Sequence, residues 1–206
     1  MELSKKVSEQ KKPKKVYEVY APPYFGGRWL GSTVADDPSK VMGRVLRTSL
    51  YAITDDFTKQ YMLMRFKITE VKDSVCNTVF YGHEYGREYL RSLVKRGTNK
   101  IEYIFDVTTR DGFVIRVYPV VFTTSRISSS KKKAIRKTMR EVLEEAAANL
   151  THDQLAQELV LGKTASDIYN RVKKIVLPRH VGVYKSKIIK LGRIEAPKPV
   201  EQEASA

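Results

Sequence analysis

The sequence has little of what disulfide-bonded, zinc-binding or secreted proteins require. It contains one cysteine, Cys76, and three histidines among 206 residues. A single cysteine excludes an internal disulfide, and histidines without paired cysteines do not indicate a zinc site. No charged leader or long apolar run indicates secretion or membrane insertion. We therefore expect a cytoplasmic protein, in which Cys76 is a small buried side chain rather than a nucleophile.

Acidic residues are also missing from two long stretches. None lies between Gly112 and Glu141, and none lies from Arg171 to Arg193. The chain carries 38 Lys and Arg against 23 Asp and Glu, a net charge of +15. Clustered positive charge is typical of proteins that neutralise phosphates, so nucleic acid is the expected partner. No segment pairs a basic face with exposed Trp, Phe and Leu, so no membrane partner is expected.

The composition predicts one compact domain with tails. At 42% hydrophobic residues, the chain is long enough to bury a substantial core. The lysine-rich start has few apolar side chains to offset the entropy lost on ordering. The end is rich in Pro, Ala and Glu and lacks apolar periodicity. We expect a basic disordered arm at 1–16, a single α+β globular domain at 17–194 and a flexible tail at 195–206.

Alternation with a period of two dominates the first part of the domain. The runs 44–53, 61–71 and 75–83 are rich in Val, Leu, Ile, Tyr and Phe, and predict strands. In the clearest strand pair, 101–124, the dipeptide Asp111-Gly112 predicts a two-residue turn that places Phe105 opposite Tyr118.

Two further features of the region point to an irregular sheet. Pro119 cannot donate a ladder hydrogen bond, which predicts an edge strand or a bulge there. A curled or barrel-like sheet would accommodate it. Residues 88–95 interrupt the strands with a short helical pattern.

After Ser130 the apolar period becomes 3.6. One helical stripe is formed by Ile135, Met139, Val142, Leu143, Ala146 and Leu150. Thr151 and Thr164 each precede an amide or acid by three residues, which predicts two further helix starts with hydroxyl caps. Residues 179–194 return to alternation and predict a final strand. The order favours an α+β fold with a mostly antiparallel, barrel-like sheet flanked by helices.

The helix that starts near Lys131 carries its charges in the unfavourable order. The charged residues of its first turns are all cations, while Glu141, Glu144 and Glu145 come later. A cation at the positive end of a helix costs about 0.3 to 1 kcal/mol when exposed. The pairs of Lys137 with Glu141 and of Arg140 with Glu144 each stabilise the helix by only a few tenths of a kcal/mol. Such an order indicates an external polyanion.

The N-terminal lysines are followed by aromatic residues. Tyr17, Tyr20, Tyr24, Phe25 and Trp29 surround Arg28, a mixture that suits single-stranded or irregular RNA. Each aromatic is either a stacking platform or part of the core. We predict that RNA is bound by Lys5, Lys6, Lys11, Lys12, Lys14, Lys15, Arg28, Arg126, Lys131, Lys132, Lys133, Arg136, Lys137, Arg140, Lys173, Lys174, Arg179, Lys185 and Lys187.

One alternative function is enzymatic. Asp56, preceded by Asp55, and the pair Glu70 and Lys72 resemble the loose acid, acid-x-lysine pattern of Mg²⁺-dependent nucleases. The simpler interpretation is an Asp-rich turn between two strands. No Ser-His-Asp or Cys-His order is present, so we predict no catalytic residues, no resident metal and no cofactor.

Several segments together resemble one known family. The chain is similar, in order and spacing from residue 14 to 193, to the eS-one (S-three-A-e) family of archaeal and eukaryotic small-subunit ribosomal proteins. The segments that carry the resemblance are Lys14–Pro22, Met64–Ile68, Thr108–Arg116, Ile135–Met139 and Ile175–Lys185. A short segment between Leu30 and Val45 and a brief acidic tail resemble the archaeal members.

The resemblance implies a structural, non-catalytic role in translation. It places the protein in the cytoplasmic ribosome, on the platform of the small subunit near the messenger exit. Ribosomal RNA and neighbouring small-subunit ribosomal proteins are the implied partners, with messenger RNA as a further candidate. It also implies a central β-barrel flanked by helices. The family has no catalytic residues to assign to this sequence.

Overall fold

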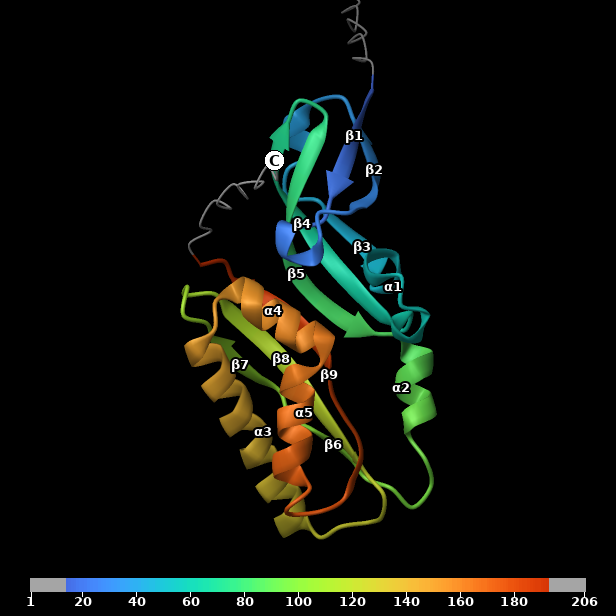
Figure 1. Cartoon of the computed structure of the whole chain (residues 1–206), viewed down its shortest axis with the longest axis vertical. Coiled ribbons are helices and arrows are strands. Elements are labelled where there is room, and N and C mark those ends of the chain that lie inside the picture. Colours follow the sequence, from blue (N-terminus) through green and yellow to red (C-terminus); the bar gives the residue numbers. More distant parts are fainter. Residues whose placement is uncertain (1–13, 193–206) are drawn as a thin grey trace, which may run out of the picture.

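The computed structural model describes residues 14–192, which form one nine-stranded sheet with helices packed beside it (Figure 1). The strands are β1 (Lys15–Tyr20), β2 (Trp29–Ala35), β3 (Val45–Ser49), β4 (Met62–Lys72), β5 (Val75–Tyr85), β6 (Lys100–Glu102), β7 (Phe105–Thr108), β8 (Val114–Thr123) and β9 (Pro178–Lys190). The α-helices are α1 (Tyr51–Thr54), α2 (Arg87–Leu93), α3 (Ser129–Asn149), α4 (His152–Leu161) and α5 (Lys163–Val172), with 3-10 turns at η1 (Pro23–Phe25), η2 (Pro38–Lys40) and η3 (Phe57–Lys59). The predicted α+β class is confirmed.

The sheet has two halves that meet at β5 and β9. In the first half, β5 pairs with β4 and β1, which in turn pair with β3 and β2. In the second half, β9 pairs with β8, and β8 pairs with β6 and β7. All pairs except β1 with β5 are antiparallel. The pairings of residues 14–192 leave the sheet open, with ends at β2 and β6, rather than closed into a complete barrel.

The register of the β7–β8 pair differs by one residue from the prediction. Phe105 pairs with Val117 rather than with Tyr118, and Ile101 of β6 pairs with Val121. Val117 and Val121 belong to the core that the helices cover. Because successive side chains of a strand point to opposite faces, Tyr118 lies on the face away from those helices.

The length of the loop between β7 and β8 explains the one-residue difference in register. The Thr109 N–H donates to the Phe113 carbonyl at 2.9 Å, and the Gly112 N–H donates to the Thr109 carbonyl at 3.0 Å. Residues 110–112 therefore form a three-residue loop instead of a two-residue one. Gly112, with φ of +78°, takes the left-handed position that follows a type I turn in such loops.

The bulge expected at Pro119 is confirmed. β8 is an interior strand, and its pairing with β9 shifts between Tyr118 and Pro119. Tyr118 faces Lys185 and Pro119 faces Val183, so Tyr184 is the extra residue. The Tyr184 ring lies against the Tyr118 ring, with the centroids 5.7 Å apart.

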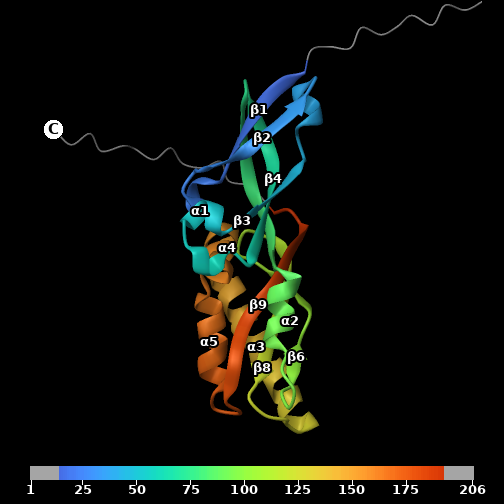
Figure 2. The ribbon, with the colours of Figure 1, turned by 90° about the vertical axis from the view of Figure 1, so that its right-hand side faces the viewer.

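Helices α3, α4 and α5 cover one face of the second half (Figure 2). The predicted stripe of α3 is confirmed, because Ile135, Met139, Val142 and Leu143 are buried against the sheet and α5. The helical pattern at 88–95 forms α2 and the last alternating run forms β9. Within residues 14–192 no helix combines the length and apolar character needed to span a membrane.

The two predicted helix caps have different outcomes. Thr151 forms a full capping box with Gln154 at the start of α4, as predicted. The prediction for Thr164 is wrong. Gly162, with φ of +94°, ends α4 and directly precedes α5, so Thr164 is a buried helical residue whose hydroxyl lies 3.4 Å from the Glu158 carbonyl.

Two strand boundaries also differ from the prediction. The run 44–53 forms only β3, because Leu50 is fully buried and its carbonyl accepts from the Ile53 and Thr54 N–H groups, which starts α1. β1 begins at Lys15, inside the predicted arm, because Lys15 already pairs with Ala35 of β2. Residues 1–13 and 193–206, which hold the rest of the arm and the tail, lie outside the described residues.

A buried contact fixes the two halves where β5 crosses β9. A Cβ at Gly82 would lie 2.3 Å from the Ser186 carbonyl oxygen, so the strands approach as closely as glycine allows. His83 Nε2 donates to the Val183 carbonyl at 2.8 Å, and its Nδ1 accepts from the Ser186 hydroxyl at 2.8 Å. Burial lowers the pKa of His83 to about 4, so the ring is neutral at physiological pH.

Candidate nucleic-acid interface

The first half of α3 forms one wall of a groove, which we call the α3 groove. Its volume is about 610 Å³, and Tyr103, between β6 and β7, lines it together with the helix. The other lining residues are Ser130, Lys133, Ala134, Arg136, Lys137 and Arg140. Four of the seven lining residues are cations and none is a carboxylate. A groove of this composition attracts an anion.

The cations of the α3 groove keep donors free for a ligand. Arg136 Nε donates to the Glu102 carbonyl at 3.1 Å, which holds the guanidinium against β6. Lys137 Nζ lies 3.7 Å from a Glu141 carboxylate oxygen, and its side chain is 78% exposed. Exposed pairs of this kind are worth little, so exchanging the carboxylate for a phosphate costs little.

Charge also gathers at the very start of α3. The N-cap residue, Ser128, makes no side-chain cap hydrogen bond, and the first turn contains no acidic residue. Within residues 14–192, no ion pair involves Lys131, Lys132, Lys133 or Arg126. These cations therefore add to the partial positive charge of the helix end instead of compensating it.

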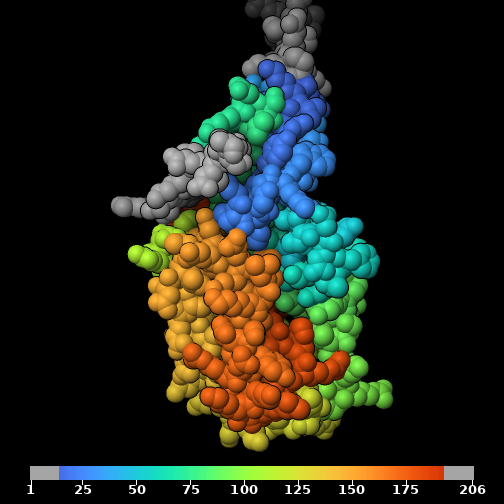
Figure 3. All heavy atoms as spheres, in the orientation of Figure 1, coloured from blue at the N-terminus to red at the C-terminus, as the bar shows by residue number. Residues whose placement is uncertain are grey.

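A second basic cluster lies toward the same end of the molecule. Lys173 and Lys174 follow α5, Arg179 is the second residue of β9, and all three are exposed. Figures 1 and 3 show the segments around 125–130 and 173–179 near one another at this end. The structure thus brings together basic residues from two of the predicted runs.

The other predicted cations are dispersed. Lys14 and Lys15 are exposed at the opposite end, where β1 begins (Figure 1). Arg28 is paired with Asp55. On β9, Lys185 lies over the Tyr118 ring, 5.8 Å from its centroid, and Lys187 is exposed. Lys5, Lys6, Lys11 and Lys12 lie outside the described residues.

The aromatic residues after the arm divide between core and surface. Tyr17 and Phe25 are buried in two separate apolar clusters, which excludes them as stacking platforms. Tyr24 is half-buried, and its hydroxyl accepts from the Phe80 N–H at 3.0 Å. Tyr20 is partly exposed, and its hydroxyl donates to the Glu18 carboxylate at 2.8 Å. Trp29 is 58% exposed on β2, so these two rings are accessible to a base.

The residues of the nuclease pattern do not converge. Asp56 caps η3 through the Thr58 N–H and hydroxyl, which lower the pKa of its carboxylate. Glu70 accepts from the Asn77 amide at 3.2 Å and lies 3.5 Å from Lys72 Nζ. Asp56 precedes β4 and Glu70 lies near its far end, about 25 Å along an extended strand. Residues 14–192 contain no cluster of three metal-ligating side chains, so Asp56, Glu70 and Lys72 do not form the metal site that the nuclease alternative requires.

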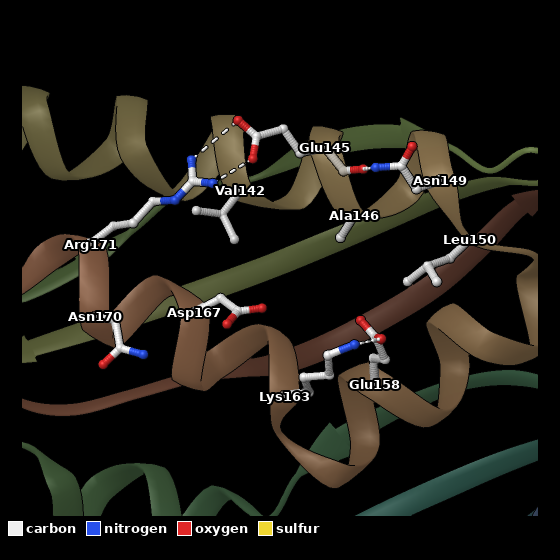
Figure 4. Close-up of a pocket in the computed structure, with 10 residues that line it drawn as sticks. All are labelled: Val142, Glu145, Ala146, Asn149, Leu150, Glu158, Lys163, Asp167, Asn170 and Arg171. Carbon is white, nitrogen blue, oxygen red and sulfur yellow. Dashed lines mark hydrogen bonds and ion pairs between the residues drawn. The ribbon is translucent and has the colours of Figure 1, made fainter.

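A second groove, between α3, α4 and α5, has the opposite chemistry (Figure 4). Its volume is about 390 Å³, and three carboxylates and two cations line it. Arg171 binds Glu145, with one nitrogen–oxygen distance of 3.2 Å, and Lys163 binds Glu158. We call it the α3–α5 groove. Its net charge is −1 in a chain of net charge +15, which makes it a poor site for RNA.

The sequence interpretation missed two arginines that lie far from the predicted Lys185 along the chain. Arg47 and Arg65, from β3 and β4, both donate to the Glu84 carboxylate, and Lys185 Nζ lies 3.7 Å from the same group. Arg47 and Arg65 stand alone in alternating strands and not in charge runs. Only the β3–β4 register, which pairs them directly, could have revealed the cluster.

Comparisons with known proteins give consistent matches to one family. The Ribosomal S3Ae family matches residues 2–192. The protein named small ribosomal subunit protein eS1 from Desulfurococcus amylolyticus is 46% identical over 193 residues, 94% of this chain and 91% of that protein. The proteins of the same name from Staphylothermus marinus and Methanothrix thermoacetophila are 45% and 43% identical over 94% and 93% of this chain, and 91% and 90% of their own lengths. The chain belongs to the Ribosomal S3Ae family, and these three similar proteins come from archaea.

Proposed function

We propose that the protein is a structural, non-enzymatic constituent of the small ribosomal subunit that binds ribosomal RNA through the α3 groove. The observation that carries this proposal is the concentration of cations at the start of α3, beside a groove lined by no carboxylate. Family membership gives the context, because the similar proteins are named small ribosomal subunit proteins.

The α3 groove suits the RNA backbone rather than a particular base. Arg136 and Arg140 present planar guanidinium groups that bind phosphate oxygens in pairs, and Lys133 and Lys137 supply point charges beside them. Contacts to phosphates fix the position of a protein on RNA but read no sequence. Tyr103 offers an aromatic ring at the groove wall on which an unpaired base can stack.

The proposal extends to the location and organisation of the chain. The protein would act in translation within the cytoplasmic ribosome, on the platform near the messenger exit, beside neighbouring ribosomal proteins and messenger RNA. The basic arm predicted at 1–16, whose last two residues belong to β1, would add lysines that contact the RNA backbone beside the globular domain predicted at 17–194. The resemblance to the family supports this location. The electrostatic attraction of lysine-rich arms to RNA supports the RNA contacts of the arm.

Sedimentation of the native protein tests the proposal. A lysate is run on a Mg²⁺-containing gradient before and after a high-salt wash. We expect the protein to sediment with the small ribosomal subunit and to remain there after the wash, because many phosphate contacts act together. Sedimentation as a free protein would contradict the proposed function.

A further inference from the structure

Outside the α3 groove, an excess of positive charge also surrounds Glu84 on β5. Arg47, Arg65 and Lys185 all approach its single carboxylate. The hydrogen bond from Arg65 and the charges of the other two cations hold the pKa of Glu84 below its usual value, so the carboxylate stays charged. Three positive charges against one leave an excess of two.

These side chains line a cavity of about 650 Å³, which we call the Glu84 cavity. Arg87 and Glu88 at the start of α2 also line it, so the lining holds four cations and two carboxylates. Tyr184, the extra residue of the β9 bulge, lines the same cavity. The net charge of +2 is not compensated by other lining residues, since the rest are uncharged.

The local arrangement is unfavourable without a further anion. Arg47 lies directly opposite Arg65 in the β3–β4 ladder, and like charges in that position destabilise a sheet. Arg65 Nε is buried and, within the described residues, has no hydrogen-bond acceptor. Glu84 therefore neutralises only one of the two charges of this pair and leaves Arg65 Nε without an acceptor. Unfavourable local arrangements of this kind tend to occur at functional sites.

One residue, Glu102, contacts side chains of both the Glu84 cavity and the α3 groove. The Glu102 carbonyl accepts from Arg136 of the α3 groove, and its carboxylate accepts from the Tyr184 hydroxyl at 3.2 Å. Glu102 belongs to β6, which ends the strand order of the sheet. A polyanion seated in the α3 groove can therefore continue around this edge toward the Glu84 cavity.

We propose that the Glu84 cavity binds a backbone phosphate of ribosomal RNA, as a second contact beyond the α3 groove. The proposal rests on the proposed function, since it takes the ligand to be the same RNA. A phosphodiester carries one negative charge and presents two oxygens, which match the free donors of two neighbouring guanidinium groups. The close crossing of β5 and β9 at Gly82 fixes Glu84 and Lys185 before the RNA arrives.

The test measures binding of the full chain to small-subunit ribosomal RNA over a range of salt concentrations. Arg65→Gln and Arg47→Gln each remove one cation from the cavity, and Glu84→Gln removes the competing carboxylate. Arg171→Gln is the matched control, because it removes an equally paired arginine from the α3–α5 groove. Melting curves verify that each variant folds, and Arg47, 56% exposed on β3, gives a variant with little packing to lose.

We expect Arg65→Gln and Arg47→Gln each to weaken binding about tenfold and to reduce the salt slope by about one. Glu84→Gln should bind RNA at least as tightly as the unmodified chain, although it melts at a lower temperature. Arg171→Gln should bind within about twofold of the unmodified chain. A purely structural ion cluster would instead lower the melting temperature in all three cavity variants and leave the RNA affinity unchanged, which would overturn the inference.

Two further outcomes separate this inference from the proposed function. Normal binding by both arginine variants, with loss of binding in the α3 groove variant Arg136→Glu, would refute the Glu84 cavity and leave the proposed function intact. Absence of RNA binding by the unmodified chain would refute the proposed function itself. Titration with inorganic phosphate, followed by the NMR signal of Arg65 Nε–H, identifies the source of the anion. A shift with phosphate but none with RNA would contradict an RNA ligand.

Discussion

Helices α3 and α4 follow one another in the chain and begin in opposite ways. α4 starts with a complete capping box between Thr151 and Gln154, and Asp153 places an acidic residue in its first turn. α3 starts at Ser128 with no side-chain cap bond and no acidic residue in its first turn, but with Lys131 at the position where α4 has Gln154. The cap hydrogen bonds and the acidic first turn stabilise the start of α4, whereas the start of α3 has neither.

The difference shows which helix start serves the fold and which serves a ligand. α4 borders the α3–α5 groove, where carboxylates and cations neutralise each other within the protein. α3 borders the α3 groove, whose lining holds four cations and no carboxylate, although Lys137 and Arg140 pair with Glu141 and Glu144 outside it. Both helices bury apolar residues in the same core, so packing does not explain the contrast. The unfavourable charges of α3 make sense when RNA supplies the missing anions.

The largest effect should come from reversing charge beside the α3 groove. The double variant Lys132→Glu with Arg136→Glu should weaken binding to small-subunit ribosomal RNA by at least about 100-fold at physiological salt. The salt slope should fall by about two or more, since two phosphate contacts are lost. Filter binding over a salt series measures both quantities. A slope equal to that of the unmodified chain would remove α3 from the interface.

A smaller effect should distinguish the two helix caps. Thr151→Ala removes the hydroxyl that accepts from the Gln154 N–H and should cost about 1 kcal/mol in the free energy of unfolding. Ser128→Ala removes a hydroxyl with no cap bond and should cost only a few tenths. Urea unfolding of the two variants makes the comparison. Equal losses would show that α3 is capped like α4 after all.

The smallest effect concerns the α3–α5 groove. Arg171 holds the pKa of Glu145 below its usual value through a hydrogen bond. The pair thus contributes stability above the unfolded pKa, and this stability is lost as the pH falls through the lowered folded value. Arg171→Gln should slightly reduce the fall of the melting temperature with decreasing pH, without changing RNA affinity. Melting temperatures between pH 3 and 7 measure it, and an RNA defect in this variant would break the contrast between the grooves.

Much of the fold follows from local patterns in the sequence. The apolar stripe of α3 predicts the buried Ile135 and Met139, because a period of 3.6 is specific for a packed helix. Pro119 predicts its bulge because it lacks a donor wherever it lies in a ladder. The capping box of α4 is likewise local, since Thr151 and Gln154 satisfy each other's backbone.

The predictions are wrong where a contact outside the local motif decides between two structures that the motif allows. The dipeptide Asp111-Gly112 fits both a two-residue and a three-residue loop, and the pairing of Thr109 with Phe113 selects the longer one. Thr164 has the sequence of a cap, but Gly162 already joins α4 to α5. Arg47 and Arg65 near Glu84 come from separate strands, so a search for charge runs does not find them as it found Lys185.

The central claim is that α3 gives up stability at its start in order to bind RNA, and Lys131→Glu tests it most directly. The substitution creates at Ser128 the same kind of capping box that α4 has and replaces a cation near the helix N-terminus by an anion. Unfolding and RNA binding are measured on the same preparation. We predict a gain of about 0.5 to 1 kcal/mol in the free energy of unfolding, together with about tenfold weaker RNA binding. Higher stability with unchanged RNA affinity would contradict the account.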